Sequence, residues 1–262
     1  MESNNPFFQH SNEKKFKFIY IFMFVSIIVC CSSKSKKNPE TIINLEILST
    51  DSLSLKNHNK NYLIGKFDYK SDSSFGIVPS IYTFKTIFLK KVVLDSFIKM
   101  AEKAKKSEIN LKIISGTRNF FEQKGIWERK WVSLSGLTDN EKAKKILEFS
   151  SMPSTSRHHW GTDIDLNNLN NSYFSNGKGL KEYTWLVENA HKFGFFQPYT
   201  SKKDGRTGYN EEKWHWSFKP ISNQYLKVYN DSVKYEDING FLGHEAASDI
   251  DVISNYVNGI EY

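Results

Sequence analysis

The chain has 262 residues, of which 39% are hydrophobic, with two cysteines and a formal net charge of +7. This length suits one well-buried domain with extensions and excludes two large domains. A positive charge suits an anionic cell envelope or nucleic acid, but the basic residues are scattered and form no arginine-rich patch with interleaved aromatic residues, so we expect no nucleic-acid partner.

Residues 1–31 have the pattern of a secretory signal peptide. Three lysines between positions 14 and 17 precede an uncharged apolar run over residues 18–29, and cysteines and serines follow. A membrane-spanning helix needs about 20 apolar residues, and this run is shorter. A basic segment, a short apolar segment and small residues together predict export.

The end of the apolar run resembles the lipobox of bacterial lipoproteins, in which a cysteine is acylated and becomes the new N-terminus. We assign this role to Cys31, although Ile28, Val29 and Cys30 differ from the usual leucine and small residues. Cleavage without lipidation, or an uncleaved anchor, is the alternative. Lysines rather than acidic residues follow Cys31, which favours a lipid anchor on the periplasmic side of the membrane.

The next segments predict a tether and then a catalytic domain. Residues 32–60 are rich in Ser, Lys and Asn and poor in aromatic residues, which is typical of a flexible tether. The domain is expected over residues 61–224. Residues 225–262 are expected to form a helical extension that packs against it.

Inside the domain, patterns of apolar residues predict helices and short strands. Apolar residues at steps of three and four predict an amphipathic helix over 86–106. Residues 111–114 predict a strand that ends at a glycine turn, followed by a helix over 120–131. Two more helices are expected, over 139–149 with Thr138 as its cap and over 179–193.

The segment between the last two helices holds two histidines and two carboxylates within eight residues. Residues 156–166 read Ser-Arg-His-His-Trp-Gly-Thr-Asp-Ile-Asp-Leu, and residues 211–216 read Glu-Glu-Lys-Trp-His-Trp. A catalytic zinc ion takes three histidine or carboxylate ligands and keeps one position open for water. Two neighbouring ligands and one remote ligand would complete such a site.

Spacing selects the faces of two predicted strands but leaves the individual residues open. Alternation over 162–166 places both aspartates on one face, and over 214–218 it separates His215 from the aromatic residues. Strict extension also places Glu211, rather than Glu212, on the face of His215 unless the chain bends before the strand. Three choices therefore stay open at this point: His158 or His159, Asp163 or Asp165, and Glu211 or Glu212.

Together these segments resemble the VanY-type zinc D-alanyl-D-alanine carboxypeptidases and dipeptidases. The signature of that family is S-x-H-x-x-G-x-A-x-D followed by E-x-W-H. The matching residues here are Ser156, His158, Gly161, Asp165, Glu212, Trp214 and His215. An upstream segment from Ser115 to Arg118 resembles the family's S-G-Y-R, with Gln123 at the matching later position. The resemblance covers roughly residues 86–219.

The resemblance implies that His158, Asp165 and His215 bind one zinc ion. It also implies that Glu212 is the general base, against the alternation argument, and that Arg118 contacts the substrate and stabilises the transition state. Zinc would activate the attacking water and polarise the scissile carbonyl. Glu212 would then pass the proton to the leaving amine.

One residue departs from the signature, because Asp163 stands where the family usually has alanine. Its carboxylate either supports a metal ligand or changes the choice of substrate. The residues expected to bind substrate are Ser115, Gln123, Ser156 and Asp163. Among the tryptophans, we expect Trp160 in the wall of the cleft and both Trp214 and Trp216 in the core.

The implied fold is an α+β domain of the Hedgehog/DD-peptidase type, in which helices cover a small antiparallel sheet that carries the zinc site. The implied function is removal of D-alanine from peptidoglycan stem peptides in the cell envelope. An endopeptidase or an L,D-carboxypeptidase with the same site is an alternative. A non-catalytic zinc-containing module that binds the cell wall is another, because the fold also occurs in Hedgehog signalling domains.

Overall fold

The structure is a computed structural model that describes residues 60–261. The expected signal peptide, the lipidation site at Cys31 and the expected tether up to residue 59 lie outside the described residues. Among residues 60–261, no helix combines the length and the apolar character needed to cross a membrane.

The strands of the described region form two antiparallel sheets. The smaller sheet pairs β1 (Phe75–Ile77) with β2 (Phe88–Lys90). The larger sheet has four strands in the order β3 (Ile113–Ser115), β4 (Asp163–Leu166), β6 (His215–Phe218) and β5 (Phe195–Phe196). β4 and β6 are the two central strands of this sheet, and every residue in both is buried.

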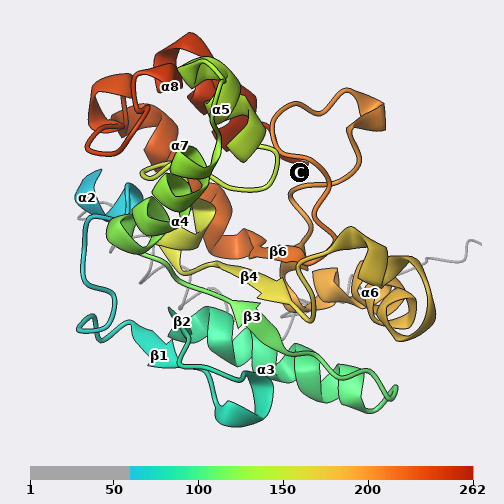
Figure 1. Cartoon of the computed structure of the whole chain (residues 1–262). Coiled ribbons are helices and arrows are strands. Elements are labelled where there is room, and N and C mark those ends of the chain that lie inside the picture. The colour runs from blue at the N-terminus through green and yellow to red at the C-terminus, as the bar shows by residue number, and fades with distance from the viewer. Residues whose placement is uncertain (1–59, 262) are drawn as a thin grey trace, which may run out of the picture. The chain divides into compact units, whose positions relative to one another are not determined.

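Helices cover the larger sheet (Figure 1). They are α2 (Lys60–Leu63), α3 (Lys91–Lys105), α4 (Phe120–Ser133), α5 (Asp139–Ile146), α6 (Gly177–Asn189), α7 (Lys219–Ser232) and α8 (Ala246–Asp249). Figure 1 shows α4, α5, α7 and α8 on one side of the sheet and α3 on the other. The expected α+β class, with a small antiparallel sheet under helices, is confirmed.

Local sequence explains where these helices begin. Asn119 and Glu122 form a reciprocal capping box at the start of α4, and Thr138 and Glu141 form another at the start of α5. The helix expected over 86–106 starts only at Lys91, because residues 88–90 pair with β1 instead. A pairing with a remote strand overrides the local helical pattern there.

The alternation expected for the two central strands is present in their register. Asp163 pairs with Ser217 and Asp165 pairs with His215, while Ile164 pairs with Trp216. The polar side chains therefore share one face of the sheet, and the apolar side chains face the core on the other.

The boundary expected between residues 224 and 225 falls inside α7, and the C-terminal segment packs against the domain as expected. Tyr225 and Tyr229 of this helix are fully buried, and their ring centroids lie 6.0 and 6.2 Å from that of Trp160. The expectation that Trp160 forms the cleft wall is wrong. Its indole is in the core, where its N–H donates to the carbonyl of Leu63.

Candidate metal centre

Three buried side chains meet at one end of the β4–β6 pair. Asp165 and His215 are cross-strand partners, and His158 comes from the helical turn at Arg157–Trp160 that precedes β4. Their candidate ligand atoms all lie within 4.8 Å of one another. The Asp165 carboxylate lies 3.4 Å from His158 Nε2 and 3.0 Å from His215 Nδ1. These are the three residues that the signature selected.

A glycine ends the turn that presents His158. Gly161 has a φ of +72°, and a Cβ atom there would lie 2.4 Å from the ring of Phe75. Only glycine fits both requirements without strain. The turn also separates the two adjacent histidines, because His159 points away from the centre and its Nδ1 lies 2.7 Å from the carbonyl oxygen of Arg118. Burial lowers the pKa of His159 to about 3, so this ring is neutral.

Hydrogen bonds select which nitrogen of each ligand histidine faces the centre. His158 Nδ1 lies 2.8 Å from the carbonyl oxygen of Gly116, which can only accept, so Nδ1 carries the proton and Nε2 is free to bind a metal. His215 Nε2 lies 2.9 Å from the Asp163 carboxylate, and its Nδ1 faces Asp165. Two imidazole nitrogens and one carboxylate oxygen are a donor set that fits catalytic zinc.

The charges around His215 suit a cation. Burial opposes the charged form of this imidazole, but hydrogen bonds to Asp163 and Asp165 outweigh burial and raise its pKa to about 9. Both carboxylates lie within 3.0 Å of this imidazole and would equally favour a metal cation beside Nδ1. Because a ligand histidine binds through a deprotonated nitrogen, metal binding would compete with protonation of this ring.

The chain turns just before β6, and this turn directs the side chain of Glu212, and not that of Glu211, into the cavity. The amide of His215 donates to the carbonyl of Glu212 at 3.2 Å, which breaks the strict alternation of an extended strand. Glu212 Oε2 lies 3.6 Å from His215 Nδ1, whereas Glu211 does not line the cavity. Burial raises the pKa of Glu212 to about 8. A divalent cation beside it would favour the carboxylate form.

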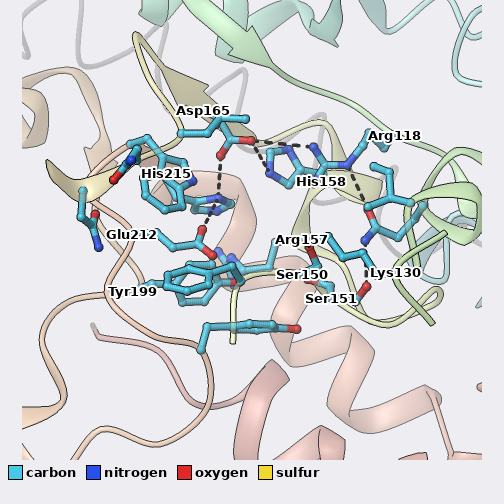
Figure 2. Close-up of a pocket in the computed structure, with 18 residues that line it drawn as sticks. Arg118, Lys130, Ser150, Ser151, Arg157, His158, Asp165, Tyr199, Glu212 and His215 are labelled. Atoms are coloured by element: carbon cyan, nitrogen blue, oxygen red, sulfur yellow. Dashed lines mark hydrogen bonds and ion pairs between the residues drawn. The ribbon is translucent and has the colours of Figure 1, made fainter. Parts of the chain in front are cut away.

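These residues open into a cavity of about 480 Å³ (Figure 2). Arg118 lies across the ligands from Glu212 in this view. Its Nε donates to Gln123 Oε1 at 3.0 Å, its Nη1 donates to Ser115 Oγ, and Nη1 lies 3.8 Å from Asp165. Burial lowers the pKa of Arg118, and the Asp165 and Glu212 carboxylates oppose that effect. A guanidinium thus stands beside the candidate metal.

Three of the four residues expected to bind substrate, Ser115, Ser156 and Asp163, do not line this cavity. Asp163 is fully buried, and its carboxylate contacts Arg157, Thr162, His215 and Ser217. Ser156 is also buried, and its hydroxyl has no hydrogen-bond partner among the described residues. Asp163 shares its face of the sheet with Asp165 but lies two residues earlier on β4, where its carboxylate contacts Nε2 at the back of His215. By contrast, Gln123 lines the cavity and Ser115 contacts Arg118.

The cavity also contains residues that sequence reasoning missed. Lys130 lies at its edge and donates to the Ser150 hydroxyl, and Tyr199 packs its ring 4.7 Å from that of His215. A helical pattern could have found Lys130, because it lies seven residues after Gln123 on the same face of α4. Trp214 was expected in the core but lines the cavity as well.

The C-terminal segment holds one wall of the cavity in place. Arg206 donates to the carbonyl oxygens of Thr200, Tyr209 and Gly259, and the amide N–H of Glu261 donates to the carbonyl oxygen of Pro198 at 2.8 Å. The loop between Tyr199 and Glu212 is thereby tied to the end of the chain. The tail contributes to the site through this loop.

Known proteins resemble this chain over part of its length. The predicted carboxypeptidase YodJ of Bacillus subtilis is 29% identical over 147 residues, and a D-alanyl-D-alanine carboxypeptidase of Enterococcus faecalis is 28% identical over 127 residues. These matches cover 55% and 48% of this chain, and 50% and 46% of the relatives. The chain thus spans about half the length of the curated relatives it matches.

Solved structures are similar at lower levels. VanYB in complex with D-alanine-D-alanine is 21% identical, with a TM-score of 0.47 over 65% of this chain and 90% of that one. The LdcB LD-carboxypeptidase is 26% identical, with a TM-score of 0.48 over 70% and 80% of the two chains.

The model of the VanY family, described as D-alanyl-D-alanine carboxypeptidase, matches residues 86–221, more than half of this chain. With the signature residues gathered at one buried centre, the protein belongs to the VanY D-alanyl-D-alanine carboxypeptidase family.

Proposed function

We propose that this protein is a zinc-dependent carboxypeptidase that removes the terminal D-alanine from peptidoglycan stem peptides. The observation that carries the proposal is the arrangement of Glu212 and Arg118 on either side of the three candidate ligands, in one cavity (Figure 2). Membership of the VanY family supports the reaction class. A non-catalytic binding module would not need a buried glutamate at that position.

His158, Asp165 and His215 would hold the zinc ion. When bound, zinc acts as a Lewis acid that polarises the scissile carbonyl and makes water a stronger nucleophile near neutral pH. Glu212 takes the proton from the attacking water and delivers it to the leaving amine. The Arg118 guanidinium stabilises the negative charge that develops on the carbonyl oxygen. Its hydrogen bonds to Gln123 and Ser115 hold it in that direction.

A carboxypeptidase also needs a cation for the terminal carboxylate of its substrate. Arg118 is beside the ligands, and Arg157 is paired with Asp163. Lys130 lies at the cavity edge beside Ser150 and Ser151, and it is in no ion pair within the described part of the chain (Figure 2). We assign the terminal carboxylate to Lys130 and these two serines. This assignment favours an exopeptidase over an enzyme that cuts within crosslinks.

The rest of the substrate has room on the other side of Arg118. A second cavity of about 360 Å³ shares Arg118, Ile126, Asp165 and Leu169 with the first. A peptide that places its last residue near Lys130 would extend past Arg118 into this second space. The two cavities together accommodate a stem peptide rather than a dipeptide.

Digestion of defined muropeptides tests the reaction. The zinc-loaded protein is expected to shorten a pentapeptide stem by one D-alanine, with no change in a stem that ends in L-alanine. Glu212→Gln and His215→Ala should leave the pentapeptide intact. Loss of D-alanine only from tetrapeptides would indicate an L,D-carboxypeptidase, and opening of crosslinked dimers an endopeptidase. Activity equal to that of His215→Ala would refute the proposal.

The location is part of the proposal. The pattern of residues 1–31, with Cys31 after an apolar run, supports export and a lipid anchor in the cell envelope. Radiolabelled palmitate should enter the wild-type protein and not Cys31→Ser, and the variant should leave the membrane fraction. Unchanged membrane association without label would favour an uncleaved anchor.

A further inference from the structure

Asp163 carries a charge at a position where the family signature has alanine, and its surroundings differ from those of a substrate-binding residue. No part of its surface is exposed. Oδ1 accepts from Thr162 Oγ1 at 2.6 Å and from Ser217 Oγ at 2.9 Å. Oδ2 contacts Arg157 Nε at 3.0 Å and His215 Nε2 at 2.9 Å. The carboxylate is thus fully bonded and faces the back of a metal ligand.

Arg157 compensates the charge of this carboxylate. Its side chain is 1% exposed, and its Cζ lies 4.9 Å from the centroid of the Trp160 ring. Besides the bond to Asp163, its Nη2 donates to Ser217 Oγ at 2.7 Å. Ser217 therefore accepts from Arg157 and donates to Asp163, which closes a ring of three side chains. A buried charge without a partner is strongly destabilising, so Arg157 and Asp163 depend on each other.

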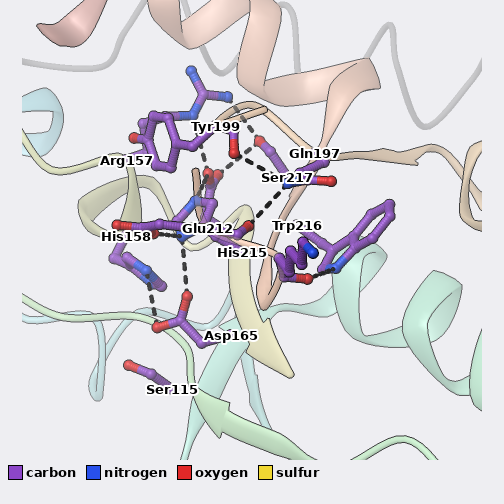
Figure 3. Close-up of polar contacts among 12 residues, drawn as sticks. Ser115, Arg157, His158, Asp165, Gln197, Tyr199, Glu212, His215, Trp216 and Ser217 are labelled. Carbon is purple, nitrogen blue, oxygen red and sulfur yellow. Dashed lines mark hydrogen bonds and ion pairs between the residues drawn. The ribbon is translucent and has the colours of Figure 1, made fainter. Parts of the chain in front are cut away.

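Figure 3 shows Arg157 and Ser217 on the side of His215 away from Asp165. The imidazole of His215 therefore lies between two carboxylates, Asp163 behind it and Asp165 in front. The bond to Asp163 keeps a proton on Nε2 and directs Nδ1 toward the centre. A carboxylate on the far nitrogen of a ligand histidine fixes the ring and increases its basicity.

We propose that the triad of Arg157, Asp163 and Ser217 is a charge-compensated support that orients His215 for metal binding. Asp163 is the positioning residue, and Arg157 makes its burial possible. The inference rests on the zinc site of the proposed function and goes beyond it, because it assigns this chain's departure from the signature to metal affinity and not to substrate choice. The catalytic residues themselves are unchanged by it.

Zinc affinity, measured by competition with a chromogenic chelator, tests the inference without any substrate. Asp163→Ala should bind zinc about 10- to 100-fold more weakly than wild type, the usual effect of losing such a partner. Asp163→Asn keeps an acceptor for His215 Nε2 and should recover part of the affinity. Ser217→Ala removes one partner of Asp163 but leaves its bond to His215, so its loss of affinity should be smaller than that of Asp163→Ala. Ser222→Ala, at a buried serine of α7 outside the triad, is the control and should bind zinc as wild type does.

The visible spectrum of the cobalt-substituted protein is the second readout, because it reports ligand geometry. Asp163→Ala should change it, and the control Ser222→Ala should leave it as in wild type. If Asp163→Ala does not fold, the double variant Arg157→Met/Asp163→Ala removes both charges together. That variant should fold better than Arg157→Met alone, and it should still bind zinc more weakly than wild type.

Two results would overturn the inference and are distinguishable from a failure of the proposed function. Wild-type zinc affinity and an unchanged cobalt spectrum in Asp163→Ala, or in the double variant, would show that His215 needs no such support. Unchanged zinc affinity combined with altered stem-peptide selectivity would show that Asp163 acts on the choice of substrate instead. A wild-type protein that binds no zinc at all would refute the proposed function and, with it, the basis of the triad.

Discussion

The metal centre and the wall of the cavity hold their polar side chains in different ways. The metal floor, defined as His158, Asp163, Asp165 and His215 with Arg157, is buried, and each of its side chains contacts another member. The cavity wall, defined as Gln123, Lys130, Ser150, Tyr199 and Trp214, comes from remote segments. Lys130 and Ser150 contact each other at the edge, and Gln123 holds Arg118.

Because of this difference, substitutions in the two parts should affect the reaction in different ways. A change in the metal floor leaves a buried charge unpaired or a metal without a ligand, so its effects should be large and spread through the centre. A change at the exposed edge of the cavity wall, where Lys130 contacts Ser150, leaves the contacts within the floor intact. Substitutions in the two parts should therefore differ in size and in the kinetic constant that they alter.

The largest effect is expected from removal of a ligand. His215→Ala should abolish stoichiometric zinc binding and lower kcat/KM by at least about 1,000-fold, since several kcal/mol of transition-state stabilisation depend on the metal. Metal analysis of the purified protein and the pentapeptide assay measure both quantities. His191→Ala, at an exposed histidine of the described region, should behave as wild type. Near-normal activity of His215→Ala would place the metal elsewhere.

The next effect separates the proton carrier from the ligands. Glu212→Gln should keep zinc and lower kcat by about 100- to 10,000-fold, because the amide cannot accept the proton from water. Glu211→Gln is the matched control and should change kcat little, since Glu211 does not line the cavity. A large loss of kcat in Glu211→Gln and a small one in Glu212→Gln would identify Glu211 as the base, as strict alternation in the strand predicts.

Arg118 lies between the two parts and should give a smaller loss. Arg118→Met removes a cation directed at the developing oxyanion, and removal of one such donor lowers kcat by about 100- to 1,000-fold. Zinc affinity should change less than it does in His215→Ala. Arg129→Met, at an exposed position of α4, serves as the control. A rise in KM with unchanged kcat would instead assign Arg118 to ground-state binding.

The metal floor was accessible from the sequence because its signals are local. Alternation placed both aspartates on one face of their strand and separated His215 from the aromatic residues of the other, and the register of β4 and β6 brings these faces together. Spacing could not choose between neighbouring residues, however. The choice of His158 depends on the turn that ends at Gly161, and the choice of Glu212 depends on a bend that only tertiary structure reveals.

The cavity wall was largely inaccessible because its residues become neighbours only through packing. Trp160, expected in the cleft wall, is covered by α7, whereas Trp214 is buried as expected but also lines the cavity just before β6. The loop from Tyr199 to Glu212 is held by Arg206 and the end of the chain, far outside any signature. Aromatic character predicts burial but not which side of a sheet becomes the core.

The smallest predicted effect tests the wall directly, at Lys130. Because this ammonium is at the exposed edge, its ion pair with a substrate carboxylate should contribute about 1 kcal/mol, or about fivefold in affinity. Lys130→Met should therefore raise KM about fivefold and leave kcat and zinc content unchanged. Lys99→Met, on an exposed face of α3, controls for lost surface charge. A pentapeptide that ends in a carboxamide tests the same contact from the side of the substrate. Wild type should hydrolyse this peptide less efficiently than the pentapeptide with a free carboxylate, and Lys130→Met should not distinguish the two. If both proteins distinguish them equally, Arg118 of the metal centre, and not Lys130 of the wall, binds the terminal carboxylate.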